Sequence, residues 1–166
     1  GDGQGASNAS RVAQAGDLVS FANGLKSEWG TDRVFLMGDF NAYSKEDPIK
    51  VLTDAGYIDQ GSKSGKYSYS FSGQSGSLDH VFASPAANQR VRGADVWNIN
   101  SGESIALEYS RYNYNATNFY DTSAFRSSDH DPVLVGVDLT PTATVNLVDI
   151  NDFHGRIDAN TPQFAG

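Results

Sequence analysis

The sequence predicts an α/β fold, in which helices flank a mostly antiparallel sheet. Three patterns point to this class: apolar residues at helical spacing near the N-terminus, a short apolar run bounded by turn residues, and a segment of strict alternation. The 166 residues suffice for one modest domain, and 39% of them are hydrophobic, so a packed core is expected.

The first predicted element is a helix over residues 8–27. Its apolar positions recur every three or four residues and make one apolar face, formed by Val12, Ala15, Leu18, Val19, Ala22 and Leu25. Ser7 or Asn8 is placed to cap the start of this helix, and Gly30 lies just beyond its end. One side of the helix is therefore expected to be buried.

A buried strand and a second helix follow. Residues 33–37 are the apolar run, whose length and flanking turn residues predict a buried strand. The sequence GDFN at 38–41 comes directly at its C-terminal end. A short helix is expected over 47–55, because Pro48 suits the first turn of a helix.

Strands and one long loop make up the rest. Residues 67–72 alternate strictly and predict a half-exposed strand, residues 73–76 a turn, and residues 78–83 the returning strand. Further strands are expected within 91–99 and over 133–137. Residues 101–128 have no clear period and predict a long loop, of the kind that is often functional when ordered. Residues 140–145 are interpreted as a linker to a new unit.

Composition excludes several classes of protein. The net charge of −8 disfavours a module that wraps nucleic acid, whereas an enzyme that gathers carboxylates around a divalent cation can be acidic. The absence of cysteine excludes disulfides and thiolate metal sites. No apolar run approaches the roughly 18 residues of a membrane span. A surface rich in Ser, Asn, Gly and Tyr and poor in Lys is typical of export, so we expect an extracellular protein.

The segment 38–41 places a carboxylate and an amide at the end of the first strand. In an extended backbone, residues two apart share a face, so Asp39 and Asn41 are expected to point together into a cleft beyond the strand. This pair suits holding a water molecule and a phosphoryl oxygen in a fixed relation. The alternative is a plain Asx turn, for which Gly-Asp-x-Asn is favourable.

The segment 77–81 carries a carboxylate next to an imidazole. Alternation directs Asp79 and His80 to opposite faces of the strand, so only one of them can face a given site. If Asp79 faces the site, His80 lies outside the catalytic set. The alternative is a surface histidine beside an aspartate that flanks a turn.

The segment 127–132 precedes the last strand. Asp129 is a hard oxygen ligand suited to magnesium or calcium, and His130 is suited to act as a general base at neutral pH. The alternative is a strand cap with solvated charges.

Taken together, these segments resemble a known family. GDFN at 38–41, SLDHVFAS at 77–84 and SSDHDPV at 127–133 resemble, in order and placement, the C-terminal motifs of the endonuclease/exonuclease/phosphatase superfamily. The opening GDGQGASNASR is similar to a stretch of its bacterial extracellular nucleases. The resemblance covers residues 1–139 and implies half of a four-layer, deoxyribonuclease-I-like α/β sandwich.

The resemblance also implies a mechanism. Members of this superfamily hydrolyse phosphoesters by in-line attack of water, with Mg²⁺, Mn²⁺ or Ca²⁺ as cofactor. By that resemblance, His130 would be the base that activates water, and Asp79 would hold its ring in the correct tautomer. Asp39 would orient the water or the leaving group, Asn41 would bind a phosphoryl oxygen, and Asp129 would bind the metal.

The first half of the family's domain supplies further motifs, including a metal-binding glutamate and a second catalytic histidine. No matching segment is found here, and the acidic residues Glu28, Glu46, Glu103 and Glu108 stand in other contexts. We therefore expect these 166 residues to be part of a longer chain and to require its N-terminal half for activity.

The tail carries a separate signal. The sequence NLVDINDFHGR at 146–156 resembles the first motif of 5'-nucleotidase-type metallophosphoesterases. By that resemblance, Asp152 and His154 would ligate one ion, and residues 146–166 would begin a second domain that is truncated here. The alternative is an ordinary junction between a strand and a loop.

The leading hypothesis is thus a secreted, metal-dependent endonuclease acting on DNA or RNA. The alternatives are a lipid or inositol phosphodiesterase of the same fold, a non-catalytic binding module, and a calcium-binding surface domain. The loop 101–128 is the candidate for substrate choice, since its aromatic residues either stack on bases or pack the loop: Tyr109, Tyr112, Tyr114 and Phe119.

Overall fold

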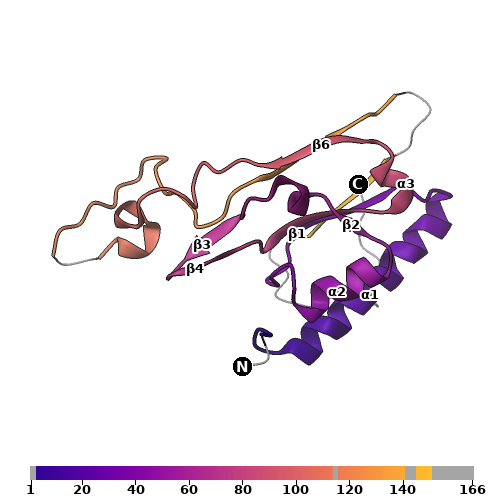
Figure 1. Cartoon of the computed structure of the whole chain (residues 1–166), viewed down its shortest axis with the longest axis horizontal. Helices are drawn as coiled ribbons and strands as arrows, with labels where there is room; N and C mark the ends of the chain where they lie inside the picture. The colour runs from indigo at the N-terminus through magenta and orange to yellow at the C-terminus, as the bar shows by residue number, and fades with distance from the viewer. Residues whose placement is uncertain (1–2, 114–115, 141–144, 151–166) are drawn as a thin grey trace.

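The structure is a computed structural model that describes residues 3–113, 116–140 and 145–150. At its centre lies a four-stranded sheet with the order β2-β5-β1-β8 (Figure 1). These strands are β1 (Val34–Asp39), β2 (Ile58–Asp59), β5 (Asp79–Ala83) and β8 (Asn146–Ile150). Strand β5 pairs antiparallel with both β1 and β2, whereas β8 pairs parallel with β1. The expected mixed α/β class with mainly antiparallel pairing is confirmed.

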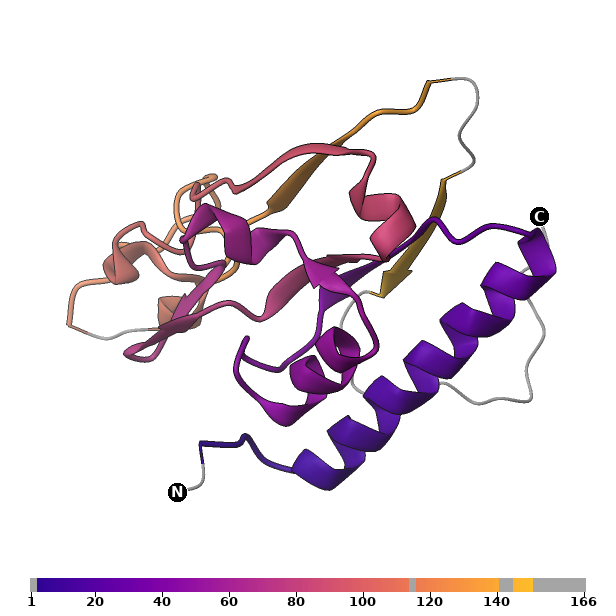
Figure 2. The ribbon, with the colours of Figure 1, turned by 45° about the vertical axis from the view of Figure 1, so that its right-hand side comes forward.

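Helices α1 (Asn8–Trp29) and α2 (Asp47–Asp54) cover one face of this sheet (Figures 1 and 2). Both helices were predicted close to these bounds. Their apolar sides pack against alternate residues of β1 and β5 in a core that includes Leu18, Ala22, Val34, Leu36, Ile49, Leu52 and Phe82. No helix in the described ranges is long and apolar enough to cross a membrane.

The ends of α1 differ in how they are closed. Ser7 occupies the N-cap position with φ at 58° and makes no side-chain capping hydrogen bond, so the predicted side-chain cap is wrong. An N-cap hydroxyl usually accepts from a helix amide when its own backbone is extended, and the left-handed backbone of Ser7 does not meet that condition. Gly30 closes the other end in the predicted way, with φ at 60° and its amide bonded to the Lys26 carbonyl.

The opposite face of the central sheet is covered by a two-stranded ribbon of β6 (Val91–Val96) and β7 (Val133–Val137). Strand β7 was predicted over the same residues, and its burial alternates: Val133, Val135 and Val137 pack inward with Phe35 and Val81, and the residues between them are exposed. The molecule is therefore layered as helices, sheet and ribbon, with one apolar core on each side of the central sheet (Figure 1).

The predicted pairing of residues 67–72 with 78–83 is wrong. Strand β3 (Tyr69–Phe71) pairs instead with β4 (Gln74–Gly76), so part of the expected turn is a strand. The reason is local: Ser72 and Gly73 both have positive φ, 49° and 80°, which makes a two-residue turn of the type that closes hairpins. Strand β5 is thereby free to pair with β1.

The predicted loop over residues 101–128 contains, in its described part, two short 3₁₀ turns, at Ile105–Leu107 and Tyr109–Arg111. The loop is anchored by a buried ion pair: Arg126 Nη2 lies 2.7 Å from Glu108 Oε1, and both side chains are almost fully buried. Arg126 also donates to the carbonyls of Ser70 and Asn100. The loop is thus tied to β3 and to Asn100, whose side chain in turn donates to the His130 carbonyl.

Strand β8 lies in the region where a linker ends and a second unit was predicted to begin. Its backbone adds to the central sheet beside β1, with Phe35 opposite Leu147. Residues 141–144 lie outside the described ranges, and the predicted domain boundary at residue 146 stays a prediction.

Candidate active site

The three sequence motifs meet at one end of the central sheet. The antiparallel register of β1 and β5 sets Asp39 directly opposite Asp79, so both side chains belong to the same face. The segment before β7 joins them, because His130 forms a bridge with Tyr69 and the amide of Ser70 donates to the Asp129 carbonyl. Sheet pairing therefore gathers residues that are far apart in the chain.

His130 and Asp79 form a hydrogen-bonded pair. His130 Nδ1 lies 2.8 Å from Asp79 Oδ2, which also accepts a 2.7 Å bond from the Ser68 hydroxyl. The hydrogen bond to Asp79 raises the pKa of His130 against the opposing effect of burial, and the charges of Asp79, Asp39 and Asp129 add to the increase. Among the described residues, Nε2 of His130 has no hydrogen-bond partner, and its side chain is 29% exposed.

Asp39 and Asn41 do not share a strand face as expected, and the alternative interpretation, an Asx turn, is confirmed. Strand β1 ends at Asp39, and Asn41 has φ at 46°, so the two residues do not share a face through extended alternation. Instead, Asp39 Oδ1 accepts from the Asn41 amide at 2.8 Å, which is an Asx turn. The turn brings Asn41 Nδ2 within 3.4 Å of Asp39 Oδ2 and leaves Asn41 exposed at the site.

Asp129 lies beside two tyrosines. Burial raises the pKa of Tyr69 and of Tyr109, and the Asp129 charge raises both further, so both phenols stay protonated at neutral pH. The Tyr69 ring packs against the His130 ring, with 4.8 Å between centroids. Asp129, Tyr69 and His130 therefore form one electrostatically coupled group.

The described residues do not by themselves fit a preformed metal centre. Within the described ranges, no group of three or more His, Asp or Glu residues is arranged to hold a metal ion. Mg²⁺ keeps several waters and is commonly held by one or two carboxylates together with substrate phosphate. Asp129 accordingly remains a candidate for a single carboxylate ligand and no more.

His80 lies on the opposite face of β5 from Asp79, as alternation predicted. It is 1% exposed, and both ring nitrogens have partners: Nδ1 lies 2.9 Å from Asp59 Oδ2 and Nε2 lies 3.0 Å from the Ala42 carbonyl. Neither ring nitrogen is left for a substrate, which supports the prediction that His80 lies outside the catalytic set.

Two supporting residues were missed by the sequence patterns. Asp131 is buried and accepts hydrogen bonds from the Asn98 and Ser101 side chains and from three successive amides, those of residues 99–101. Burial raises its pKa, but these donors hold the pKa of Asp131 below its ordinary value. Ser68 is also buried and holds Asp79. Asp131 lies within the SSDHDPV motif, but no local pattern gave it or Ser68 a role, because their partners are distant in sequence.

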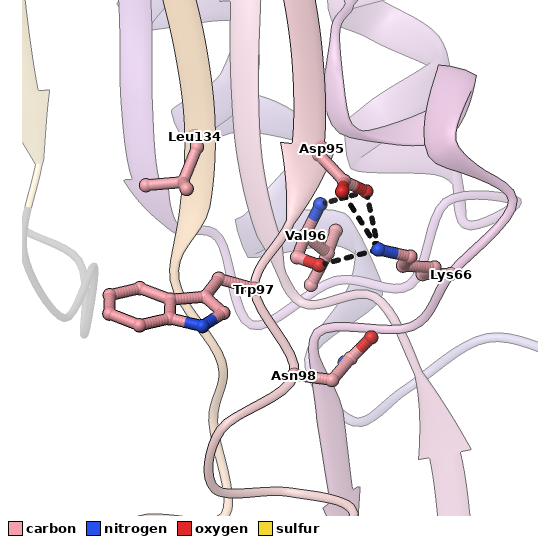
Figure 3. Close-up of a pocket in the computed structure, with 6 residues that line it drawn as sticks. All are labelled: Lys66, Asp95, Val96, Trp97, Asn98 and Leu134. Atoms are coloured by element: carbon pink, nitrogen blue, oxygen red, sulfur yellow. Dashed lines mark hydrogen bonds and ion pairs between the residues drawn. The ribbon is translucent and has the colours of Figure 1, made fainter.

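A hollow of about 520 Å³ lies elsewhere, on the ribbon of β6 and β7 (Figure 3). Lys66 lines it, paired with Asp95 and bonded to the Val96 carbonyl, while Trp97 and Leu134 lie apart from that pair. None of the predicted catalytic residues lines it. Its lining residue Asn98 touches the site indirectly, through its bond to Asp131.

The loop aromatics differ in their surroundings. Tyr109 stacks against Phe71 with 6.4 Å between centroids, whereas Tyr112 and Phe119 are more than half exposed. Tyr114 lies outside the described residues, and so do Asp152 and His154, the predicted ligands of a second site.

Comparison with known families agrees with this geometry. The sequence profile of the Endonuclease/Exonuclease/phosphatase family matches residues 2–130, a span that holds the first two motifs and the third as far as His130. Comparison with curated proteins and with solved structures finds no match. Members of this family are generally hydrolases of phosphoester bonds. The matched span exceeds half of the chain, and the chain therefore belongs to the endonuclease/exonuclease/phosphatase family.

Proposed function

We propose that the protein hydrolyses phosphodiester bonds in DNA or RNA, with His130 as general base. The observation that carries this proposal is how the His130 ring is held: one nitrogen is bonded and the side chain is partly exposed. Its Nδ1 lies 2.8 Å from Asp79, while the side chain is 29% exposed and Nε2 has no partner in the described part of the chain. A ring held through Nδ1–H presents a basic Nε2 outward, which is the geometry needed to take a proton from water.

The neighbouring groups support the remaining roles. The exposed amide of Asn41 is placed to donate to a phosphoryl oxygen as negative charge develops on it. Asp39 orients this amide through the Asx turn and is suited to orient the attacking water or the leaving group. Asp79 stabilises the protonated form of His130 that appears when the base has taken a proton.

We propose Mg²⁺, or Mn²⁺ or Ca²⁺ in its place, as the cofactor, with Asp129 as one ligand. A divalent cation would offset the negative charge of the phosphodiester in an acidic protein. Since the described residues form no three-ligand group, we propose that other residues of the family's sandwich domain complete the site. This includes the proposal that the present fold is half of that sandwich.

Two further proposals rest on sequence. An extracellular location is supported by the surface composition and by the likeness of the opening segment to extracellular nucleases. A second phosphoesterase domain from residue 146 is supported by the likeness of NDFHGR to a metallophosphoesterase motif.

The test is nicking of supercoiled plasmid by the full-length protein, with magnesium or with a chelator. We expect magnesium-dependent nicking that collapses in His130→Ala and persists in Lys50→Ala, a change at an exposed ion pair on α2. Absence of nicking by the wild-type protein would show the nuclease proposal to be wrong. Lipid and inositol phosphodiesters would then be tried, and no turnover of any of them would favour a binding module.

A further inference from the structure

The segment that carries Asp39 and Asn41 turns through a left-handed backbone. Asn41 has φ at 46°, a conformation that asparagine adopts more readily than most non-glycine residues. Such a conformation persists when surrounding contacts determine it. The Asx turn to Asp39 accounts for the amide of Asn41. The two carbonyls that follow, those of Asn41 and Ala42, are each held by a side chain from another element.

His80 holds the second carbonyl. Its Nε2 lies 3.0 Å from the Ala42 oxygen, and because a carbonyl only accepts, this bond requires a hydrogen on Nε2. The ring is fixed on its other side by Asp59, whose second oxygen accepts from the Gly61 amide. The rings of Phe40 and Phe82 pack against His80 at centroid distances of 5.8 and 5.4 Å. The donor is thus buried and rigid.

Arg11 holds the first carbonyl. Its Nη1 donates to the Asn41 oxygen at 2.9 Å, from helix α1. The same guanidinium is paired with the buried carboxylate of Glu46, which also accepts from the Tyr43 amide. Burial raises the pKa of Glu46, but its bonds from Arg11, Tyr43 and Gly5 hold that pKa below the ordinary value. Glu46 therefore stays charged and keeps Arg11 in place.

We infer that Arg11 and His80 are positioning residues that clamp the peptide following Asn41 and thereby set the direction of its side-chain amide. This inference rests on the proposed function for the role of Asn41. Under this inference, the neighbouring β5 residues Asp79 and His80 have different roles. Asp79 orients His130 on one face of the strand, and His80 orients the Asn41 turn from the other face. Arg11 and His80 touch neither water nor phosphate in this mechanism.

The test uses a matched pair of substitutions in the full-length protein, His80→Asn and His80→Gln. An asparagine amide falls near the place of Nδ1 and can keep the contact with Asp59, whereas the longer glutamine amide reaches the place of Nε2 and can donate to Ala42. With magnesium and bis(p-nitrophenyl) phosphate, we expect His80→Asn to lower kcat about tenfold to a hundredfold, because small misplacements of a catalytic group are costly. KM should change less than about twofold, and His80→Gln should restore most of kcat.

A purely structural role predicts another ranking. His80→Gln leaves the Asp59 carboxylate without its imidazole partner, so it should lose at least as much stability as His80→Asn. If kcat simply followed stability, glutamine would be the worse variant or the two would be equal. Either of those results would overturn the clamp.

A second measurement does not depend on turnover. Hydrogen exchange of the Asn41 amide, which is bonded to Asp39, should be roughly tenfold faster in His80→Asn than in His80→Gln if the clamp holds the turn closed. Equal exchange in the two variants would refute the clamp. If the wild-type protein hydrolyses no phosphodiester, the proposed function fails, and this exchange difference still decides whether the clamp exists.

Discussion

Two histidine–aspartate pairs lie on opposite faces of the same strand and differ in what they can do. His80 Nδ1 lies 2.9 Å from Asp59, and His130 Nδ1 lies 2.8 Å from Asp79, so the contacts are almost identical. The side chain of His80 is 1% exposed, whereas that of His130 is 29% exposed. The two histidines differ at Nε2. In His80 this nitrogen is bonded to the Ala42 carbonyl, whereas in His130 it has no partner among the described residues.

This comparison shows that a histidine–aspartate pair is not by itself a sign of catalysis. In the Asp59–His80 pair, every donor is used to join β2, β5 and the turn after β1. In the Asp79–His130 pair, Nε2 of the histidine has no partner among the described residues, and several carboxylates raise the pKa of the ring. The same residue types therefore hold neighbouring elements together on one face of the sheet and, in our proposal, transfer a proton on the other.

The largest expected effect comes from making the same isosteric change in each pair. Asp79→Asn should lower kcat by about 10²- to 10⁴-fold, since a neutral amide cannot stabilise the protonated base. Asp59→Asn should lower it less than about tenfold, since the new amide oxygen can still accept from the imidazole. Steady-state kinetics of the full-length protein would check this. Equal losses would contradict the separation of roles.

For the free energy of unfolding the ranking should be reversed: changes at His80 should cost more than changes at His130. His80→Phe leaves the Asp59 carboxylate and the Ala42 carbonyl buried without their donor, and we expect a loss of about 2–5 kcal/mol in the free energy of unfolding. His130→Ala, at a more exposed ring, should cost about 1 kcal/mol or less. Urea denaturation monitored by tryptophan fluorescence measures both. A larger loss for His130→Ala would reverse the comparison.

The pH dependence of activity should report only on His130. Because its pKa is raised, the acidic limb of kcat/KM should have its midpoint above 6.5, the ordinary value. Asp79→Asn removes the largest cause of that increase, so the midpoint should move to lower pH. A rate profile between about pH 5 and 9 tests this. A midpoint that stays in place in Asp79→Asn would exclude His130 as the titrating base.

The smallest expected effect is on stability as a function of pH. A raised pKa in the folded state means that the Asp79–His130 pair contributes stability fully below the unfolded value of 6.5 and loses it as pH rises through the folded pKa. The difference in Tm between wild type and Asp79→Asn should therefore be larger near pH 5.5 than near pH 9, both chosen at roughly the limits of histidine titration. A difference that grows with pH would contradict this sign.

Much of the fold follows from local pattern. The sequence predicted the apolar face of α1, the Gly30 terminus and the apolar runs that become β1 and β7, because each depends on neighbouring residues of the chain. The separation of Asp79 from His80 follows from the same rule, since neighbouring residues of a strand face opposite ways. These features needed no knowledge of distant contacts.

Other features could not be predicted from local pattern. Strand β5 pairs with β1 and not with β3, because a two-residue turn at Ser72 and Gly73 folds β3 onto β4. No periodicity in the sequence indicates the position of that turn. The Asx turn at Asn41 was one of two local interpretations, but the contacts that hold it come from Arg11 and His80, which lie 30 and 39 positions away in the chain. The burial of Glu46 and Glu108 as partners of Arg11 and Arg126 likewise arises from packing.

The sequence by itself determined which residues are candidates for the chemistry and which elements bear them, because motif order and strand alternation are properties of the chain alone. Only the tertiary structure decided what each residue does. Whether a histidine has a nitrogen left for substrate, or a carboxylate is charged, depends on groups that folding brings from other elements and on the water that folding excludes. For this protein, folding buries His80 and occupies its Nε2, whereas it leaves the His130 ring partly exposed.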